Sequence, residues 1–380
     1  MRLNPALEAM GAYPFVRLAE AKARVAAGGV ELIDLGIGEP REETPAFIRE
    51  ALCAAVRDEP VSTYPTAVGL PELREAIAGW VARRFGAPVD PASEVVPTLG
   101  SKEAIYGLAQ VVGRPGEAVA VTTPGYPVPG RSAAIAGLEV VELPLSAEHG
   151  WLPDLDAVPW ERLAVLWVTT PGNPTGAVAP VGWLDEAAAR CRAHDVVLAC
   201  DEAYVELWFD GEPPASALQL ADRRGVLAFH SLSKRSSMPG YRSGFVAGDP
   251  DLVAVLKRHR PSVGTAPPTF VQRASVAAWG DDEHVVETRA RYAAKRDVLL
   301  PALERAGLEL VGGPGSFFLW LRVPDGGDEA LAARWLERGL IVTPGSYLGA
   351  GGAGHVRAAL VPTLAACERA AELLDAMGAG

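Results

Sequence analysis

Short apolar runs alternate with amphipathic helical stretches along roughly the first 270 residues, and no other feature constrains the fold as much. Helical spacing of apolar residues is clearest at 71–85 and 183–194. Six apolar runs are strand candidates: 118–121, 140–143, 164–168, 196–200, 226–229 and 244–247. Buried strands joined by crossover helices produce this pattern. We therefore predict an α/β protein with a mainly parallel sheet covered by helices on both faces.

The pattern changes near residue 268, where longer helical stretches begin. The longest, at 282–306, is followed by strand candidates at 317–321 and 355–360. The 380 residues also exceed the size at which one hydrophobic core usually stops growing. We predict two domains, a large one of residues 40–270 and a smaller α+β domain of residues 1–39, which include an N-terminal arm, and 271–380.

Charge and composition narrow the kind of partner. The chain has 35 Lys and Arg against 47 Asp and Glu, a net charge of -12, which opposes non-specific binding to nucleic acid or an anionic membrane. The four cysteines and six histidines lack the spacing of zinc or disulfide motifs. No apolar run is long enough to span a membrane or to act as a signal peptide. We expect a cytoplasmic protein that binds small molecules and no metal.

Polar residues follow the apolar runs at the positions where an open α/β sheet binds its ligands. They form four groups: Gly100-Ser101-Lys102, residues 170–176, residues 201–204, and residues 231–234 with Arg242. Pyridoxal 5′-phosphate (PLP) requires an amine for its aldehyde, a carboxylate for its ring nitrogen, donors for its phenolic oxygen and a phosphate cradle. The four groups supply all of these, so we predict a PLP site.

Five residues are predicted to contact the aldehyde and the ring of the cofactor. Lys234 is the predicted amine, which holds PLP as a Schiff base and later acts as general base and acid. Asp201 is predicted to bond to the pyridine nitrogen. Asn173 and Tyr204 can donate to the phenolic oxygen, and Tyr126 can stack on the ring.

Five residues are predicted to lie at the phosphate end. Ser231, Ser233 and Arg242 can donate to the phosphate. Ser101 and Lys102 open a predicted helix at 103–112, whose N–H groups attract an anion. Each residue alone is more often a cap, turn or solvated loop residue, but their joint occurrence favours the cofactor site.

Arg357, in the last predicted strand, can bind a substrate α-carboxylate as a bidentate fork. A dicarboxylic substrate would need a second cation at its distal end. Arg17 on the N-terminal arm and Arg260 are the candidates for it.

These residues occur in a sequence that resembles the class I/II aminotransferases of PLP fold type I nearly end to end. The matching segments are 35–40, 64–65, 69–74, 173–176, 201–204, 231–242 and Arg357. In that family the matching residues have the roles given above. The resemblance also implies that Gly38 lies at the substrate, and that Tyr64 reaches the phosphate of the neighbouring subunit in a homodimer with shared active sites.

A narrower resemblance is to the N-succinyldiaminopimelate aminotransferases of lysine biosynthesis. It is carried by residues 233–236, 240–249, 280–285 and 342–345. It implies transamination of N-succinyl-LL-2,6-diaminopimelate with 2-oxoglutarate and glutamate. Another class I/II aminotransferase, acting on alanine, aspartate or aromatic amino acids, and a PLP-dependent C–S β-lyase remain alternatives, because both would use the same cofactor residues. A PLP-sensing regulator is disfavoured, since no DNA-binding segment precedes residue 30.

Overall fold

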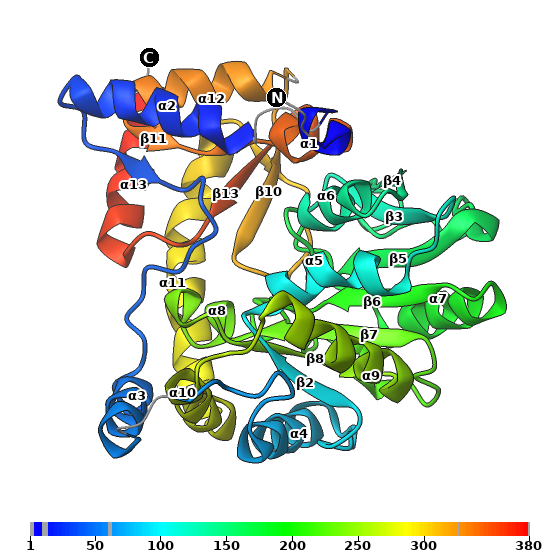
Figure 1. Ribbon diagram of the computed structural model, residues 1–380. Helices are drawn as coiled ribbons and strands as arrows, with labels where there is room; N and C mark the ends of the chain where they lie inside the picture. Colours follow the sequence, from blue (N-terminus) through cyan, green and yellow to red (C-terminus); the bar gives the residue numbers. More distant parts are fainter. Residues whose placement is uncertain (1–3, 10–13, 60–62, 326, 379–380) are drawn as a thin grey trace.

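The computed structural model describes residues 4–9, 14–59, 63–325 and 327–378, which form a large and a small sheet with their helices (Figure 1). No helix within these ranges has the length and apolar character needed to cross a bilayer. In the described chain the large sheet has seven strands in the order β2-β8-β7-β6-β5-β3-β4. β8 runs antiparallel to both neighbours, whereas the pairs among β7, β6, β5, β3 and β4 are parallel. The strands are β2 Val95–Thr98, β3 Ala118–Thr123, β4 Glu139–Pro144, β5 Leu163–Thr169, β6 Val197–Asp201, β7 Val226–Ser231 and β8 Gly244–Gly248.

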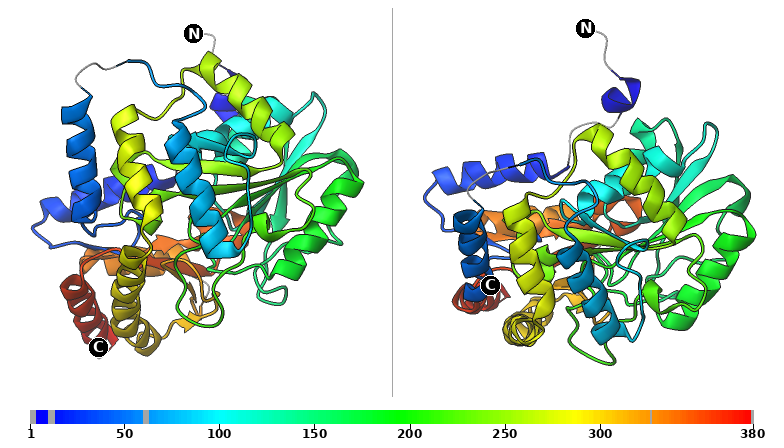
Figure 2. Two further views of the ribbon diagram at one scale, coloured as in Figure 1. Left: turned by 90° about the horizontal axis from the view of Figure 1, so that it is seen from below. Right: turned by 60° about the horizontal axis from the view of Figure 1, so that its bottom comes forward.

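Helices cover both faces of the large sheet (Figure 2). Successive strand residues alternate between the faces, so that Trp167 packs on one side and Leu166 and Val168 on the other. On the Trp167 side lie α5 Ser101–Val112, α6 Val128–Ile135 and α9 Pro250–His259. On the other side lie α4 Pro71–Phe85 and α7 Val181–Ala193. The predicted α/β class with a mainly parallel sheet is confirmed.

The small sheet has the order β12-β13-β10-β9, and a separate pair joins β1 to β11. The hydrophobic core beside these strands contains their apolar residues together with apolar residues of the long helix α11 and the C-terminal helix α13. The elements are α2 Pro14–Ala27, β1 Ile33–Asp34, β9 Glu309–Leu310, β10 Phe318–Arg322, α11 Glu283–Arg305, α12 Asp328–Glu337, β11 Leu340–Ile341, β12 Thr343–Pro344, β13 His355–Ala359 and α13 Leu364–Gly378.

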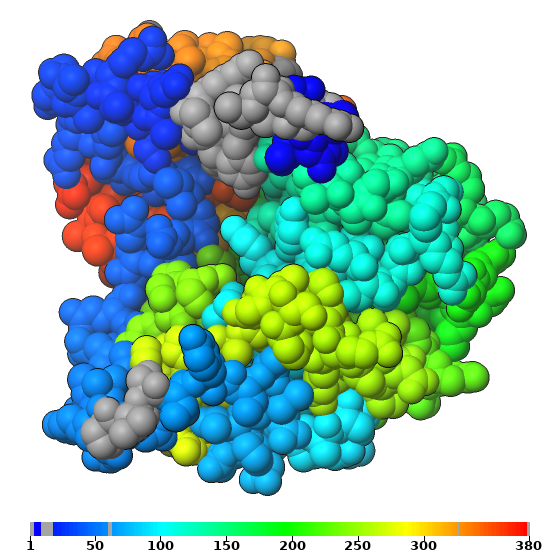
Figure 3. Space-filling view, in the orientation of Figure 1, coloured from blue at the N-terminus to red at the C-terminus, as the bar shows by residue number. Residues whose placement is uncertain are grey.

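Two segments connect the sheets. The chain from α2 to α3 (Ala46–Asp58) descends along one edge of the molecule, as the blue residues in Figure 3 show. α10 (Thr269–Gly280) packs against α3 and α4, and α11 leads from its end to the small sheet. Helix α10 thus shares a core with the large sheet. The domain boundary predicted near residue 270 stays a prediction.

Where local patterns predicted an element of the large sheet, its observed bounds are close to the predicted ones. Helix α4 has the predicted limits because Pro71 suits a first helical turn and Gly86 ends the helix with a left-handed φ of 64°. Strand β2, the strand expected to end before Gly100, was not among the six apolar runs because Pro97 interrupts its apolar sequence. Proline is tolerated there because β2 lies at the edge of the sheet.

Candidate active site

A cavity of about 570 Å³ lies between the two sheets and contains most of the predicted site residues. The large sheet contributes residues at or just after the ends of β5, β6 and β7, at the carboxyl ends of parallel strands. The small sheet contributes Phe318 and Arg357, and the N-terminal segment contributes Leu18, Lys22 and Gly38. The cavity is therefore built by three parts of the chain that are distant in sequence.

Lys234 lies on α8 (Leu232–Arg235), a single helical turn that follows β7. The hydroxyl of Ser231 caps this turn by accepting a hydrogen bond from the Ser233 N–H at 3.1 Å. The Lys234 amine donates to the carbonyl of Gly38. Burial lowers the pKa of Lys234 to about 8, although the nearby charge of Glu39 acts in the opposite direction. A lysine with this pKa is neutral in an appreciable fraction of molecules near pH 7.5 and can accept a proton.

Asp201 is the last residue of β6 and is buried beside Lys234. Burial raises the pKa of its carboxyl group to about 7, while the hydrogen bond from the Ala203 N–H and the charge of Lys234 lower it. Burial thus disfavours the charged form of this carboxyl group, and a cation at its free oxygen would stabilise that form. A protonated pyridine nitrogen would be such a cation.

Asn173 and Arg357 bond to each other across the cavity. Nη1 of Arg357 donates to Oδ1 of Asn173 at 2.8 Å, and Nη2 donates to the Gly36 carbonyl at 2.7 Å. The amide NH₂ of Asn173 is the group that can then donate to a ligand. Tyr204 is buried nearby, and burial raises the pKa of its phenol well above the usual value, so that its hydroxyl stays protonated and can also donate.

The other end of the cavity begins at the first turn of α5. Gly100 precedes this helix with a φ of 69°, and Ser101 is its first residue. A Cβ at Gly100 would lie 2.5 Å from Nη2 of Arg242, so glycine allows the guanidinium to approach the helix N-terminus. Arg242 itself has a left-handed φ of 55°. Positive charge and helix N–H groups thus converge at one point, as an anion site requires.

The comparison with known proteins decides the family. Residues 30–374 match the family model of aminotransferase class I and II. The chain belongs to this family.

Relatives of this aminotransferase cover nearly the whole chain. The LL-diaminopimelate aminotransferase of Nitratidesulfovibrio vulgaris (strain DP4) is 39% identical over 377 residues, which cover 97% of each chain. An aminotransferase structure from Neisseria meningitidis Z2491 has a TM-score of 0.90 and 36% identity, and covers 99% of this chain and 100% of that one. The probable N-succinyldiaminopimelate aminotransferase of Thermus thermophilus has a TM-score of 0.87 and 32% identity, and covers 95% of this chain and 99% of that one.

The aminotransferase uses PLP and has fold type I. When bound, PLP supplies an aldehyde that an amine can occupy and a ring that accepts electrons. The cavity fits this group: Lys234 would hold the aldehyde, Asp201 the ring nitrogen, and Asn173 and Tyr204 the phenolic oxygen. The Lys234 amine could also carry a proton to and from the substrate Cα. Arg357 would orient the substrate carboxylate.

The cavity also contains the other predicted contacts of the cofactor and substrate. These are Gly38, Ser101, Lys102, Tyr126, Ser231, Ser233 and Arg242. Ser231 and Ser233 are buried, with their hydroxyl oxygens 3.0 Å apart. The Lys102 amine lies 5.8 Å from the centroid of the Tyr126 ring.

Two of the predicted residues lie elsewhere. Tyr64 is 101% exposed and borders a different surface hollow, so a single chain does not bring it into the site. The prediction that Arg260 contacts the distal end of the substrate was wrong. Its side chain is 1% exposed, pairs with Glu103 on α5 and donates to the Ala67 carbonyl. The side chain of Arg17 lies outside the described residues.

The sequence did not point to several cavity residues. Leu18 and Lys22 lie four residues apart on α2 and face the cavity together, and Phe318 enters it from β10. Glu39 also lines it. The helical spacing on the N-terminal arm was the available signal for Lys22. Nothing local marked Phe318, because its position depends on the packing of the small sheet.

Proposed function

We propose that the protein transfers an amino group between glutamate and the keto form of N-succinyl-LL-2,6-diaminopimelate, within diaminopimelate and lysine biosynthesis. The observation that carries this proposal is the charge pattern of the cavity. Arg357 is the cation assigned to an α-carboxylate, and Lys22, which pairs with Asp34, is a further cation of the same cavity that has no role in cofactor binding. Glutamate and the succinylated substrate both have an α-carboxylate and a second, distal anionic group.

The names of the relatives support this class of substrate. The Thermus thermophilus protein is called a probable N-succinyldiaminopimelate aminotransferase, and the Nitratidesulfovibrio vulgaris relative is called an LL-diaminopimelate aminotransferase. The two substrates share a carbon skeleton and differ at the distal amine, which is acylated and neutral in one and cationic in the other.

LL-diaminopimelate is the second candidate, and Glu39 is the observation that favours it. This carboxylate lines the cavity and is close enough to raise the pKa of Lys234. It could pair with a free distal ammonium group, which the succinylated substrate lacks. Replacing Glu39 by Gln should then reduce kcat/KM for LL-diaminopimelate without reducing it for the succinylated substrate.

The deciding experiment compares kcat/KM for the two substrates with 2-oxoglutarate as acceptor. Alanine, aspartate and phenylalanine serve as competing donors. Removing the succinyl group should lower kcat/KM by about tenfold or more, the effect of losing one charge-assisted contact. Equal or better efficiency with LL-diaminopimelate would assign that substrate. Release of pyruvate, ammonia and a thiol from an S-substituted cysteine over many turnovers, without any keto acceptor, would instead indicate a β-lyase.

A variant of Lys22 localises the effect. Lys22→Met keeps most of the side-chain volume but removes the charge. Lys257→Met is the matched control, because Lys257 lies on α9 and donates to the Ala92 carbonyl outside the cavity. A loss of efficiency with succinylated substrate that spares alanine, and that the control lacks, would support a distal anion contact.

We further propose a homodimer with shared sites. The exposure of Tyr64 supports it, because Tyr64 lies in a surface hollow with other exposed apolar side chains, and such patches mark interaction sites. Val56 and Phe270 are exposed around the same hollow.

A further inference from the structure

The helical turn that carries Lys234 is too short to hold its own position. Helix α8 has four residues, and one isolated turn fixes several backbone angles in exchange for a single hydrogen bond. The two residues after Lys234 are Arg235 and Ser236, and both are buried. Both bond to one distant segment, residues 278–284, which joins the end of α10 to the start of α11.

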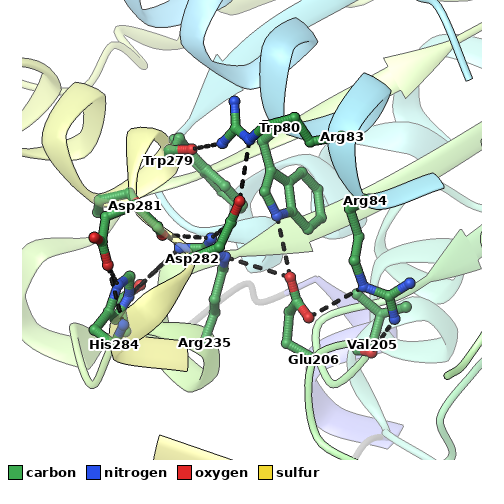
Figure 4. Close-up of polar contacts among 12 residues, drawn as sticks. Trp80, Arg83, Arg84, Val205, Glu206, Arg235, Trp279, Asp281, Asp282 and His284 are labelled. Carbon is green, nitrogen blue, oxygen red and sulfur yellow. Dashed lines mark hydrogen bonds and ion pairs between the residues drawn. The ribbon is translucent and has the colours of Figure 1, made fainter. Parts of the chain in front are cut away.

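Arg235 makes three directed hydrogen bonds to this segment (Figure 4). Its Nη1 donates to the carbonyl of Ala278 at 2.6 Å. Its Nη2 donates to the carbonyl of Asp281 at 2.9 Å and to Oδ1 of Asp282 at 2.6 Å. The side chain is 2% exposed, so these bonds form away from water. A planar guanidinium with several partners fixes both the position and the orientation of the backbone that carries it.

A buried carboxylate holds the other side of the same guanidinium. Oε1 of Glu206 lies 3.6 Å from Nε of Arg235 and accepts a hydrogen bond from the Trp80 indole at 3.1 Å. Oε2 of Glu206 accepts from Nε of Arg84 at 3.2 Å (Figure 4). Arg235 is therefore held between α10–α11 and the segment after β6. A buried charge that is paired on both sides has little freedom to move.

Ser236 makes a second connection to the same junction. Its hydroxyl oxygen lies 2.8 Å from Nε2 of His284, and Nδ1 of His284 lies 2.5 Å from Oδ1 of Asp281. Burial, and then the charge of Arg235, hold the pKa of His284 below its usual value. The neutral ring then donates from Nδ1 to Asp281 and accepts from Ser236. The order Ser-His-Asp resembles a hydrolase triad, but Ser236 is wholly buried, so the arrangement connects two segments.

Helix α11 also reaches the lysine from the side of the small sheet. It runs from the junction to the small sheet (Figure 1). There Tyr292 packs against the ring of Phe317, with centroids 5.2 Å apart. The Phe317 ring in turn lies 5.4 Å from Nζ of Lys234. Helix α11 and the two residues before it thus contact the lysine turn at its base, through Asp281, Asp282 and His284, and Tyr292 of the same helix approaches the lysine amine through Phe317.

We propose that Arg235 is a positioning residue for Lys234. Its bonds to residues 278–282 hold α8 so that the amine of Lys234 stays within reach of the substrate Cα. Displacement of a catalytic group by about 1 Å can cost about a hundredfold in rate. The proposal rests on the chemistry of the family and is independent of the identity of the distal substrate.

The test replaces Arg235 by Lys in the intact, PLP-loaded protein. This variant keeps the charge, but an ammonium group cannot make the three directed bonds. We expect kcat of the half-reaction with glutamate to fall about tenfold or more, with KM changed by less than about twofold. We also expect a shift in the pH midpoint of the bound-cofactor absorbance, which is measured without any donor. Asp282→Asn, at a half-exposed site, should shift both quantities in the same direction by less.

Arg84→Lys is the matched control, because Arg84 pairs with the same Glu206 but does not contact α8. A lower thermal midpoint for Arg235→Lys with unchanged kcat and pH midpoint would overturn the proposal, and so would equal effects in Arg84→Lys. If Arg235→Lys does not fold, Asp282→Asn decides by the same two readouts. If wild-type protein does not react with glutamate, the donor assignment fails, whereas the absorbance midpoint still tests Arg235.

Discussion

Nη1 of Arg357 donates a hydrogen bond of 2.8 Å to Oδ1 of Asn173, and this bond joins β13 of the small sheet to the loop after β5 of the large sheet. The same guanidinium donates through Nη2 to the carbonyl of Gly36, just after β1. The residue assigned to the substrate carboxylate therefore also fixes the relative position of three chain segments. It orients the amide of Asn173 as well.

Arg357→Lys should lower kcat/KM for glutamate by about 10- to 100-fold, since a charge-assisted fork worth about 1.5–3 kcal/mol is lost. Steady-state kinetics with 2-oxoglutarate as the acceptor measure this change. Arg322→Lys is the control, because Arg322 lies on the neighbouring strand β10 and pairs with Glu309 at the surface. An unchanged kcat/KM in Arg357→Lys would remove this arginine from the substrate site.

Gly100→Ala should weaken PLP binding by about tenfold, the free-energy equivalent of about 1.4 kcal/mol. The new Cβ would meet the Arg242 guanidinium at 2.5 Å, and alanine is strained at a φ of 69°. The cofactor dissociation constant of the apoprotein measures this effect. Gly107→Ala on the same helix is the control, since nothing lies within 4 Å of its Cβ. Tight PLP binding by Gly100→Ala would contradict the proposed phosphate cradle.

The sequence predicted those parts of the site that depend on where a strand ends. Asp201 and Lys234 follow apolar runs that form adjacent parallel strands, so their approach results from the sheet order. The first turn of α5 was predictable for the same local reason, because Gly100 and Ser101 separate a strand from a helix. Strand ends and helix starts are local properties, which the pattern of apolar residues records.

Local sequence patterns could not predict the contacts between segments that are distant in sequence. Arg260 was a plausible substrate cation until its pairing with Glu103, 157 residues away in sequence, placed it in the protein interior. Lys22 and Phe318 reach the cavity because the N-terminal segment and the small sheet pack above it. Nothing in the spacing of residues encodes such an approach, since it depends on how two hydrophobic cores meet.

Asp201→Asn should retain PLP but lower kcat by about a hundredfold or more, because the ring nitrogen loses a charge-assisted partner worth about 3 kcal/mol, the upper value for such bonds. The residues proposed to hold the phosphate, at α5 and Arg242, are unchanged in this variant. Cofactor content by absorbance and single-turnover kinetics separate binding from chemistry. Turnover near that of the wild type would assign the ring nitrogen to another group.

In the apoprotein, the same substitution should change how stability depends on pH. Burial raises the pKa of Asp201 from 3.8 to about 7, so the folded state holds this proton more tightly than the unfolded state does. The stability that this residue contributes is fully present below about pH 4 and is lost as the pH rises to about 7. The thermal midpoint of Asp201→Asn relative to wild type should therefore increase over this range. Asp185→Asn, at an exposed site on α7, should show no such trend.

Hybrid dimers should recover activity from two inactive parents. Tyr64 is fully exposed in one chain, whereas Lys234 lies inside the cavity. If Tyr64 serves the site of the neighbouring subunit, a hybrid of Tyr64→Ala and Lys234→Ala chains has one site with both residues intact. We expect the purified hybrid to have up to about half of the activity of the wild-type dimer, because one of its two sites is complete. Two differently tagged chains allow the hybrid to be isolated and its mass verified. A verified hybrid no more active than the better parent would show that the sites are not shared.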